Sequence, residues 1–483
     1  MSLDLVLINP PLTMEERYGK FAALGSNTPN LGLCYLASSA RSKGFSVKII
    51  DAPVQDLNIN QTVSLVKECR PKFIGVTAPT VSIIRADRVA KAIKDIGIKA
   101  PVIIGGAHVS ALPVETMKEF PAFDIGVINE GELTILDILN TDANPRDLEK
   151  ISGIVFRDNE DVFLTLPKSP TEDIDLLPYP AFDLLPDLAK HYRPSSHSYL
   201  RLPCASLVTS RGCNGKCLFC ARPFIGERYR GHSAEYTLGM IDLLVKNYGV
   251  RDILFYDDNF LLDKKRVTAI CEGLLKKNYN ISWSCLARNE TITSDFLNLI
   301  KRAGCWQIAF GIESGDQTIL NNLKKRTTVE KNLKAIELTN KAGIHSRGYF
   351  MIGCPGETVE SMNKTMDFTV SSGLKDFHST FCTPMPGSEL FDKAEDYGKF
   401  EKDWSKLGFW EPAFIPKGLS SKQLIAMHKK MFRVFYLRPK IIFRYAVFGM
   451  LHPGRIASYL KAGLAVLSYI FKTKAVDPKK VKN

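Results

Sequence analysis

The sequence predicts an α/β protein: a doubly wound, Rossmann-like parallel sheet, then a partial (β/α)6 barrel, then a helical C-terminal extension. Three observations predict this. Apolar runs that end in Gly, Pro, Asn or Asp alternate with helical patterns in residues 1–140, and the same alternation resumes in residues 201–400. Residues 401–483 have mostly helical patterns. Alternation of this kind is typical of parallel strands covered by helices.

Length and cysteine content indicate a multi-domain protein of a reducing compartment. The 483 residues are enough for more than one hydrophobic core. The eleven cysteines are an odd number, and the N-terminus has no charged region followed by a cleavage site. Both features indicate reduced thiols and predict a cytoplasmic location.

The front region, residues 1–140, carries five predicted strands. They are LDLVLINP, SVKIIDA, KFIGVTAP, PVIIGGAHV and FDIGVINEG. Ligands of doubly wound sheets bind beyond the carboxyl ends of the strands, so a binding site is expected there. The first strand is followed by NPPLTM and not by a GxGxxG run, which argues against a simple dehydrogenase.

Residues 141–200 are predicted to connect the two α/β regions. The run ISGIVFRDNEDVFLTLP has the pattern of a β-hairpin that turns at Asp158 and Asn159. The later run PTEDIDLLPYPAFDLLP is rich in proline and acidic residues and is predicted to be a linker.

Residues 201–400 contain six further predicted strands. They are ASLVTS, DILFYDD, ISWSCLA, WQIAFGIES, HSRGYFMIG and FHSTFCTPM, and helical patterns separate them. Six consecutive β/α units favour a partial barrel over a second open sheet. In such barrels the catalytic groups lie at the C-terminal ends of the strands.

Three cysteines follow the first strand of the predicted barrel. Cys213, Cys217 and Cys220 have the spacing C-x3-C-x2-C within SRGCNGKCLFCARPF. A structural zinc ion commonly takes two C-x2-C pairs, whereas a redox C-x2-C pair would not use Cys213. Three thiolates can hold an iron–sulfur cluster and leave one iron open to a reactant. We therefore predict a cluster, with free thiols or part of a zinc site as the alternative.

This motif, at this place in a six-unit β/α barrel, resembles the radical SAM enzymes. In that family the cysteines hold a 4Fe–4S cluster whose open iron binds S-adenosylmethionine (SAM). Reduction by an external donor of the flavodoxin or ferredoxin type then yields a 5′-deoxyadenosyl radical. The resemblance implies SAM contacts by Phe219, Asp257, Asp258, Arg288 and Glu313. From the residues alone, the aspartates are also consistent with a solvated acidic pair, and Glu313 with the cap of the next helix.

A doubly wound domain ahead of this barrel resembles the cobalamin-binding members of the same family. The matching runs are NPP, NLGLCYLA, TAPTVS, GGAHVS and NEGE. The resemblance implies cobalamin contacts at Asn9, Pro10, Thr77, Ser82, Gly105, Gly106, His108, Glu130 and Gly131. The D-x-H-x-x-G run that supplies a cobalt ligand in many cobalamin domains is absent. Cobalt is therefore expected without a protein imidazole. His108 is expected to line or cap the nucleotide tail, with cobalt ligation as the alternative.

On this interpretation residues 1–140 form the cobalamin-binding domain and 201–400 the radical SAM barrel. The implied activity is methylation of an unactivated carbon of a small molecule through methylcobalamin and the 5′-deoxyadenosyl radical. The first alternative is radical ring formation or contraction, as in the anaerobic magnesium-protoporphyrin ester cyclases. The second is a cobalamin-binding sensor or carrier, against which the intact cysteine triad argues. No catalytic side chain is assigned.

The basic C-terminal extension carries almost all of the net charge of +13. Residues 429–483 contain 13 Lys or Arg and one acidic residue, Asp477. The extension is interpreted either as a lid packed on the barrel or as a peripheral membrane contact through basic residues interleaved with aromatic ones. A membrane contact would suit a hydrophobic substrate. Nucleic-acid binding is not expected, since no recognised module accompanies the charge.

Overall fold

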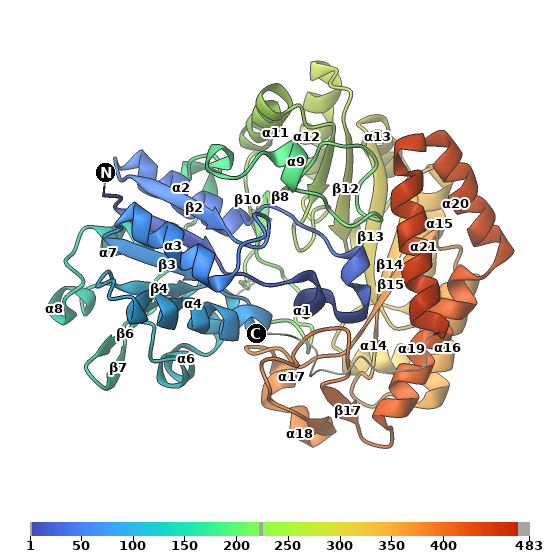
Figure 1. Cartoon of the computed structure of the whole chain (residues 1–483). Helices are drawn as coiled ribbons and strands as arrows, with labels where there is room; N and C mark the ends of the chain where they lie inside the picture. Colours follow the sequence, from blue (N-terminus) through green and yellow to red (C-terminus); the bar gives the residue numbers. More distant parts are fainter. Residues whose placement is uncertain (1, 222–225, 472–483) are drawn as a thin grey trace.

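The computed structural model describes residues 2–221 and 226–471 (Figure 1). The front domain contains a seven-stranded sheet in the order β2-β1-β3-β4-β5-β6-β7. Its strands are β1 (Leu5–Asn9), β2 (Val47–Asp51), β3 (Phe73–Thr77), β4 (Val102–Gly105), β5 (Ile125–Val127), β6 (Ile154–Asp158) and β7 (Asp161–Leu164). The first five are parallel, as predicted. The strand order reverses between β1 and β3, where sheets of this type bind ligands.

Helices cover both faces of this sheet. Leu5 and Leu7 of β1 belong to the core under α2 and α7, while Val6 and Ile8 belong to the core under α3 and α4. Asn58 begins α3 with a capping box. The helices are α1 (Met14–Tyr18), η1 (Gly19–Leu24), α2 (Leu31–Ser42), α3 (Ile59–Cys69), η2 (Thr80–Ser82), α4 (Ile83–Asp95), α5 (Ala107–Ala111), α6 (Pro113–Glu119), α7 (Glu132–Leu139) and α8 (Pro145–Leu148).

The predicted hairpin forms, but it belongs to the front sheet and not to the connection. β6 pairs antiparallel with both β5 and β7. Ile154 and Phe156 of β6 are buried in the same core as α7, and Val155 between them is buried in the core on the other face of the sheet. The connection to the barrel therefore starts after Leu164. It contains η3 (Ile174–Leu176), η4 (Phe182–Leu184) and α9 (Leu188–His191).

The second domain is an open, six-stranded parallel sheet in the order β8-β11-β12-β13-β14-β15, which confirms the predicted partial barrel (Figure 1). The strands are β8 (Cys204–Leu207), β11 (Asp252–Phe255), β12 (Ser282–Ala287), β13 (Cys305–Glu313), β14 (His345–Ile352) and β15 (Asp376–Phe381). The helices are α11 (Ala234–Tyr248), α12 (Lys264–Lys277), η5 (Asn289–Thr291), α13 (Ser294–Arg302), α14 (Gln317–Asn322), α15 (Val329–Lys341) and α16 (Val359–Ser371). A short ladder of β9 (Ser210–Arg211) and β10 (Arg230–Gly231) flanks the cysteine loop.

The C-terminal extension is helical only from Ser421 onward, later than predicted. Before it lie α17 (Glu389–Asp392), α18 (Ala394–Tyr397) and a hairpin of β16 (Gly398–Phe400) and β17 (Phe414–Pro416). The extension then contains α19 (Ser421–Tyr436), α20 (Pro439–Leu451), η6 (Pro453–Arg455) and α21 (Ile456–Phe471). Within the described ranges, no helix combines the length and the apolar composition needed to cross a membrane.

Candidate active site

The loop after β8 passes close to the cysteine sulfurs because two of its residues lack side chains. Gly212 has a φ of 85°, and a Cβ atom there would lie 2.0 Å from the carbonyl oxygen of Arg228. A Cβ atom on Gly215 would lie 3.3 Å from the Cys213 sulfur and 3.7 Å from the Cys217 sulfur. The two glycines therefore let the backbone turn tightly around the thiols.

The thiols lie beside positive charges. Arg288 donates a hydrogen bond to the Cys217 sulfur at 3.5 Å. A hydrogen bond with Cys220 lowers the pKa of the Cys217 thiol to about 6, and the charges of Lys325 and Arg288 act in the same direction. The same hydrogen bond raises the pKa of Cys220. Because the thiolate is the form that binds iron, this surrounding favours a ligand at Cys217.

The donor set fits an iron–sulfur cluster. Between residues 2 and 471, apart from 222–225, no three His, Cys, Asp or Glu side chains lie close enough to hold a single metal ion. Thiolates that bind different irons of one cluster need not converge on one point. Cys213, Cys217 and Cys220, with the side-chain-free Gly215 among them, suit a group of that size.

Lys325 connects the parts of this site, although the sequence interpretation did not select it. Its ammonium group donates a hydrogen bond to Glu313 at 2.7 Å and lies 5.8 Å from the centre of the Phe219 ring. Its carbonyl oxygen accepts a hydrogen bond from Arg288 at 2.7 Å. The Lys325 side chain is 8% exposed, whereas that of the preceding Lys324 is 49% exposed. Nothing in the run KKRTT distinguishes these two lysines, so the sequence held no signal for this role.

The backbone at Glu313 has a strained conformation, which fixes the direction of the carboxylate. Glu313 has a φ of 67°, and the register between β13 and β14 shifts at this point. A Cβ atom on Gly311 would lie 2.8 Å from the Glu313 carboxylate and 3.0 Å from the Lys325 ammonium group. Burial disfavours the charge on Lys325, but Glu313 and Cys217 raise its pKa. Lys325 is therefore charged, and it lies beside the cysteine loop.

Only one of the two aspartates after β11 is accessible. Asp257 is buried and accepts hydrogen bonds from the backbone and hydroxyl of Thr209, at 3.1 and 2.9 Å, and from the Ser210 hydroxyl. The carboxylate fixes the chain that enters the cysteine loop, and the predicted contact of Asp257 with SAM stays a prediction. Asp258 is accessible to solvent at its surface, and the partial loss of water around it, together with the charge of Asp257, raises its pKa to about 6. Its contact with SAM stays a prediction.

Arg288 and Phe219 both lie beside the cysteine loop. Arg288 bridges from Cys217 to Glu290, at a distance of 2.6 Å from the carboxylate. Phe219 packs against an apolar cluster that contains the buried thiols of Cys354 and Cys382. The contacts of Arg288, Phe219 and Glu313 with SAM stay predictions.

Inside the barrel, several side chains keep partial exposure. Along β14 and β15 the residues that pack against helices are buried, and Tyr349, Met351, His378 and Thr380 on the other face are half-buried. The ring centres of Tyr349 and His378 lie 5.4 Å apart, and those of His378 and Trp410 5.3 Å apart. The interior thus offers a partly open, aromatic wall.

The histidine of this wall is neutral near pH 7. Burial lowers the pKa of His378 to about 3, and Arg347 acts in the same direction. Burial also raises the pKa of Tyr256, which follows β11. The neutral imidazole and the aromatic rings favour a ligand with a large apolar part.

At the carboxyl edge of the front sheet, neighbouring glycines leave room for a large group. A Cβ atom on Gly105 would meet no atom within 4 Å. Gly106 has a φ of 108°, and a Cβ atom there would lie 2.9 Å from the carbonyl oxygen of Ala78. Thr77 ends the adjacent strand and is half-buried. A bulky ligand can approach the backbone at this edge, as cobalamin requires.

Asn9 and Ser82 form hydrogen bonds within the front part of the chain. The Asn9 amide donates to Asp51 at 2.8 Å, and Tyr192 donates to the same carboxylate at 2.7 Å. The Ser82 hydroxyl donates to the carbonyl oxygen of Pro79 at 3.1 Å. The predicted contacts of Asn9, Pro10, Thr77, Ser82 and the two edge glycines with cobalamin stay predictions.

His108 is buried within the front domain. It is 1% exposed, and its Nδ1 lies 3.2 Å from the Thr80 hydroxyl. Trp404 lies edge-on to the imidazole at a centre-to-centre distance of 4.9 Å. Burial lowers the pKa of His108 to about 4, so the ring is neutral. Thr80 and Trp404 flank the imidazole, which favours a packing role over cobalt ligation.

The loop after β5 joins the front domain to the cysteine loop. Arg211, two residues before Cys213, forms ion pairs with Glu130 at 3.5 Å and with Glu132 at 2.5 Å. Arg230 donates a hydrogen bond to Glu130 at 3.1 Å. Burial opposes ionisation of Glu130, but Arg230 and Arg211 lower its pKa.

These ion pairs join the two domains, and the predicted contacts of Glu130 and Gly131 with cobalamin stay predictions. Glu130 was expected beside the cobalamin tail, and its carboxylate is bound by two arginines of the barrel domain because both domains meet here. A Cβ atom on Gly131 would lie 3.0 Å from a methyl group of Leu36, so this glycine permits close packing on α2. The carboxyl edges of both sheets therefore meet at the cysteine loop.

Known families match both halves of the chain. Residues 207–369 match the model of the Radical SAM superfamily, and residues 21–139 match the B12 binding domain. An uncharacterized methyltransferase of Pyrococcus horikoshii is 32% identical over 92% of this chain and 94% of its own length. The anaerobic magnesium-protoporphyrin IX monomethyl ester cyclase of Rubrivivax gelatinosus is 26% identical over 86% of this chain and 75% of its own length.

A solved structure has the same fold. The radical SAM methyltransferase TsrM of Kitasatospora setae, with cobalamin and a [4Fe-4S] cluster bound, superposes with a TM-score of 0.66 at 18% identity, covering 82% of this chain and 78% of that one. The two family matches and the methyltransferase that is 32% identical over 92% of this chain together show the family. The chain belongs to the cobalamin-binding radical SAM family, whose cofactors are a 4Fe–4S cluster, SAM and cobalamin.

Proposed function

We propose that this enzyme methylates an unactivated carbon of a small, largely apolar molecule. The observation that carries the proposal is the ion-pair contact of Arg211 with Glu130 and Glu132, which brings the carboxyl edge of the cobalamin-binding sheet to the cysteine loop. A methyl carrier and a radical source held at that junction face the same substrate. The named methyltransferase activity of the Pyrococcus horikoshii relative supports the same reaction.

The residues of this chain act by binding and orienting. When bound, the cluster supplies the electron that cleaves SAM to a 5′-deoxyadenosyl radical, and cobalamin carries the methyl group. Cys213, Cys217 and Cys220 hold the cluster, while Lys325 and Glu313 fix the adjoining wall. Tyr349 and His378 shield the substrate from water.

The electron comes from outside the chain. Reductive cleavage consumes one electron, and we propose a flavodoxin- or ferredoxin-type protein as its donor. A cytoplasmic location follows from the same requirement. All eleven cysteines are unpaired, as expected in a reducing compartment.

The reaction is tested by anaerobic incubation of the reconstituted enzyme with reductant and SAM that carries a deuterated methyl group. Methylation transfers that label to the product and releases S-adenosylhomocysteine and 5′-deoxyadenosine in equal amounts. Ring formation, the reaction named for the Rubrivivax gelatinosus relative, would release 5′-deoxyadenosine without S-adenosylhomocysteine or label. That outcome would replace the proposed reaction.

A second test concerns cobalt. Because His108 is buried between Thr80 and Trp404, the cob(II)alamin form is expected to show no nitrogen superhyperfine splitting from an axial imidazole. Electron paramagnetic resonance (EPR) spectra of the wild type and His108→Ala should therefore be alike. Splitting that is present in the wild type and lost in the variant would identify His108 as the ligand.

A further inference from the structure

Helix α21 has two apolar faces, and only one of them is covered. Ala462, Val466 and Tyr469 point inward and are buried. On the opposite face, five large apolar side chains are between 40% and 67% exposed: Ile456, Leu460, Leu464, Leu467 and Phe471. Their spacing of three and four residues places them in one stripe, which we call the outer stripe. Exposed stripes of this length mark an interaction surface.

The inner face of α21 packs on η1, on α19 and on the segment before β8, so the outer stripe has a fixed direction. The Arg455 guanidinium lies 4.4 Å from the Tyr199 ring centre and 4.5 Å from that of Tyr459. At the other end, the Tyr469 hydroxyl lies 2.5 Å from Nδ1 of His428, whose Nε2 lies 2.9 Å from the carbonyl oxygen of Ser379. Exposure of the outer stripe is therefore a property of the packed fold.

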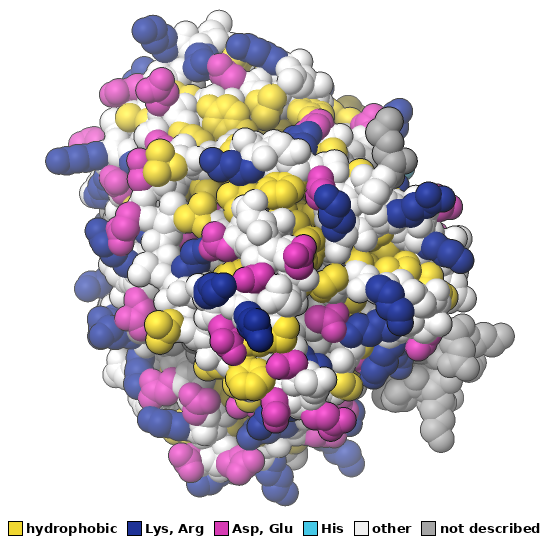
Figure 2. Space-filling model, turned by 90° about the vertical axis from the view of Figure 1, so that its left-hand side faces the viewer, with side chains coloured by type: hydrophobic (Ala, Val, Ile, Leu, Met, Phe, Trp, Pro, Cys, Tyr) yellow, Lys and Arg dark blue, Asp and Glu magenta, His cyan; other side chains and the backbone are white. Residues whose placement is uncertain are grey.

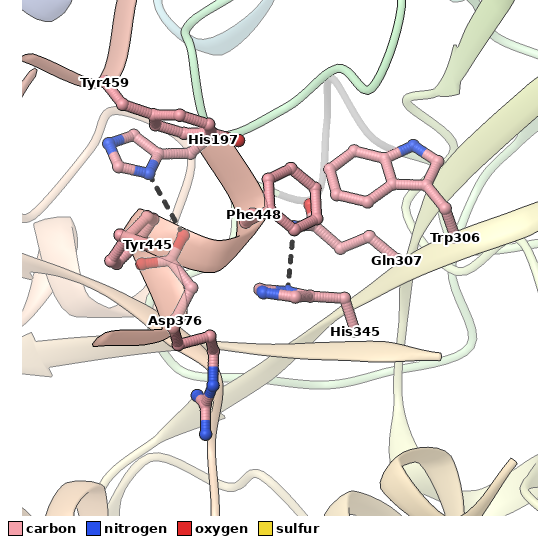
Figure 3. Close-up of a pocket in the computed structure, with 9 residues that line it drawn as sticks. His197, Trp306, Gln307, His345, Asp376, Tyr445, Phe448 and Tyr459 are labelled. Atoms are coloured by element: carbon pink, nitrogen blue, oxygen red, sulfur yellow. Dashed lines mark hydrogen bonds and ion pairs between the residues drawn. The ribbon is translucent and has the colours of Figure 1, made fainter. Parts of the chain in front are cut away.

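Figure 3 shows how the extension closes the end of the barrel where the strands begin. Tyr445, Phe448 and Tyr459 of the extension cover a small cavity whose floor includes His345 and Asp376. The cavity volume of about 20 Å³ is enough for one water molecule. Such tight closure leaves the inner face without room for a ligand, and the outer stripe is the free surface of the extension.

Helix α20 adds a second exposed apolar row. Ile442, Phe443 and Met450 are 55%, 71% and 69% exposed, and their spacing also places them on one side of the helix. Ile441, on the opposite side, is buried. The two helices lie next to each other along one end of the molecule (Figure 1).

The helical extension itself carries charge of one sign. Residues 429–471 contain eight basic and no acidic residues, and Lys440 and Lys461 are exposed beside the two rows. By sequence, residues 472–483 add five lysines and one aspartate. The face over the front domain is different, because positive and negative side chains are mixed on it (Figure 2).

We propose that the outer stripe of α21 and the exposed row of α20 dock on the surface of an anionic lipid bilayer. Large aliphatic and aromatic side chains with exposed lysines on the same helices match the boundary between acyl chains and anionic headgroups. A protein partner of ordinary mixed charge would leave these cations without counterions. Since no helix of the described chain can cross a bilayer, the contact lies in the interface plane.

Docking would bring the gap between the two edge strands of the barrel, which α21 bridges, next to the membrane. Helix α21 runs from Tyr199, just before edge strand β8, to His428, which contacts edge strand β15. It therefore spans the two unpaired edges of the barrel sheet. This placement favours a substrate that partitions into lipid, and it stands apart from the chemistry at the cysteine loop.

The test is flotation of the full-length protein with vesicles of phosphatidylcholine alone or mixed with phosphatidylglycerol. The wild type should float with the mixed vesicles and be released by salt. Leu460→Glu/Leu464→Glu should weaken binding by at least about ten-fold, because two charges would enter the acyl boundary. Lys440→Glu/Lys461→Glu should weaken it by about five-fold for each lysine and leave the apolar rows intact.

A matched control tests whether the replacement of any two exposed leucines by glutamate weakens vesicle binding. Leu166 and Leu176 of the connection are 77% and 78% exposed, so Leu166→Glu/Leu176→Glu should bind vesicles as the wild type does. Equal melting temperatures of all variants would show that the fold is intact. Vesicle binding that survives the α21 substitutions would overturn the proposal. So would a wild-type dimer, seen by light scattering, that the α21 substitutions convert to a monomer. Neither outcome depends on methylation.

Discussion

Replacement of Cys213, Cys217 and Cys220 by alanine should remove the iron–sulfur cluster and abolish formation of 5′-deoxyadenosine. The loop that carries the three thiols passes close to them only because Gly212 and Gly215 lack side chains, and it has no further cysteine to substitute. Iron content, the visible absorption of the cluster and chromatography of the nucleoside products measure the effect.

The matched control is Cys354→Ala/Cys382→Ala. These two thiols are fully buried in an apolar cluster behind Phe219, so their loss should leave the iron content unchanged. A triple variant of the loop that still cleaves SAM reductively would contradict the assignment of the cluster. Loss of iron in the control as well would mean that the cluster has other ligands.

Lys325→Met should abolish productive SAM binding. The substitution leaves the Glu313 carboxylate buried without its cation, and breaking a buried ion pair in this way costs about 3–5 kcal/mol. It also removes the positive charge beside Phe219 and Cys217. We expect formation of 5′-deoxyadenosine to fall by at least about a hundred-fold, because 1.4 kcal/mol corresponds to a factor of about ten.

Two further variants separate a role in binding from a role in folding. Lys324→Met changes the adjacent lysine, which is 49% exposed and paired with Glu389, and should leave SAM cleavage unchanged. Lys325→Met/Glu313→Gln removes both charges and should recover the melting temperature without recovering SAM cleavage. Recovery of cleavage by the double variant would show that the ion pair only stabilises the fold.

Much of the fold was predictable because it depends on local patterns. The apolar runs of β1 and β3 are buried on both faces, and such runs read directly as central parallel strands. The cysteine spacing was also local, and it located the loop after β8. The hairpin of β6 and β7 formed as predicted. Its membership in the front sheet depends on pairing with β5, which the run of residues does not encode by itself.

The parts that could not be predicted depend on long-range contacts. Asp257 and Asp258 are neighbours in sequence, and only the turn after β11 decides that one is buried under Thr209 while the other is accessible. Lys324 and Lys325 are also neighbours, and only the fold decides that the side chain of Lys325 is buried beside Glu313 while that of Lys324 is exposed. Glu130 matched a cobalamin-domain run, but arginines of another domain bind it.

The C-terminal extension was interpreted as either a lid or a membrane contact, and the structure shows why the sequence allowed both. The same helix α21 packs Tyr469 against Phe21 of η1 and His428 of α19, and it leaves Leu460 and Leu464 at the surface. An apolar helix with two such faces gives a nearly continuous hydrophobic run. Its division into faces becomes clear only when the barrel is in place.

We expect this one chain to hold the cluster and cobalamin at a shared junction. The most direct measurement is the spin relaxation of cob(II)alamin by EPR, with the cluster oxidised and then reduced. A paramagnetic cluster close to cobalt speeds that relaxation, so reduction should accelerate it in the wild type and have no effect in the cysteine triple variant. If the relaxation of cob(II)alamin in the wild type does not depend on the redox state of the cluster, the two cofactors do not share a junction.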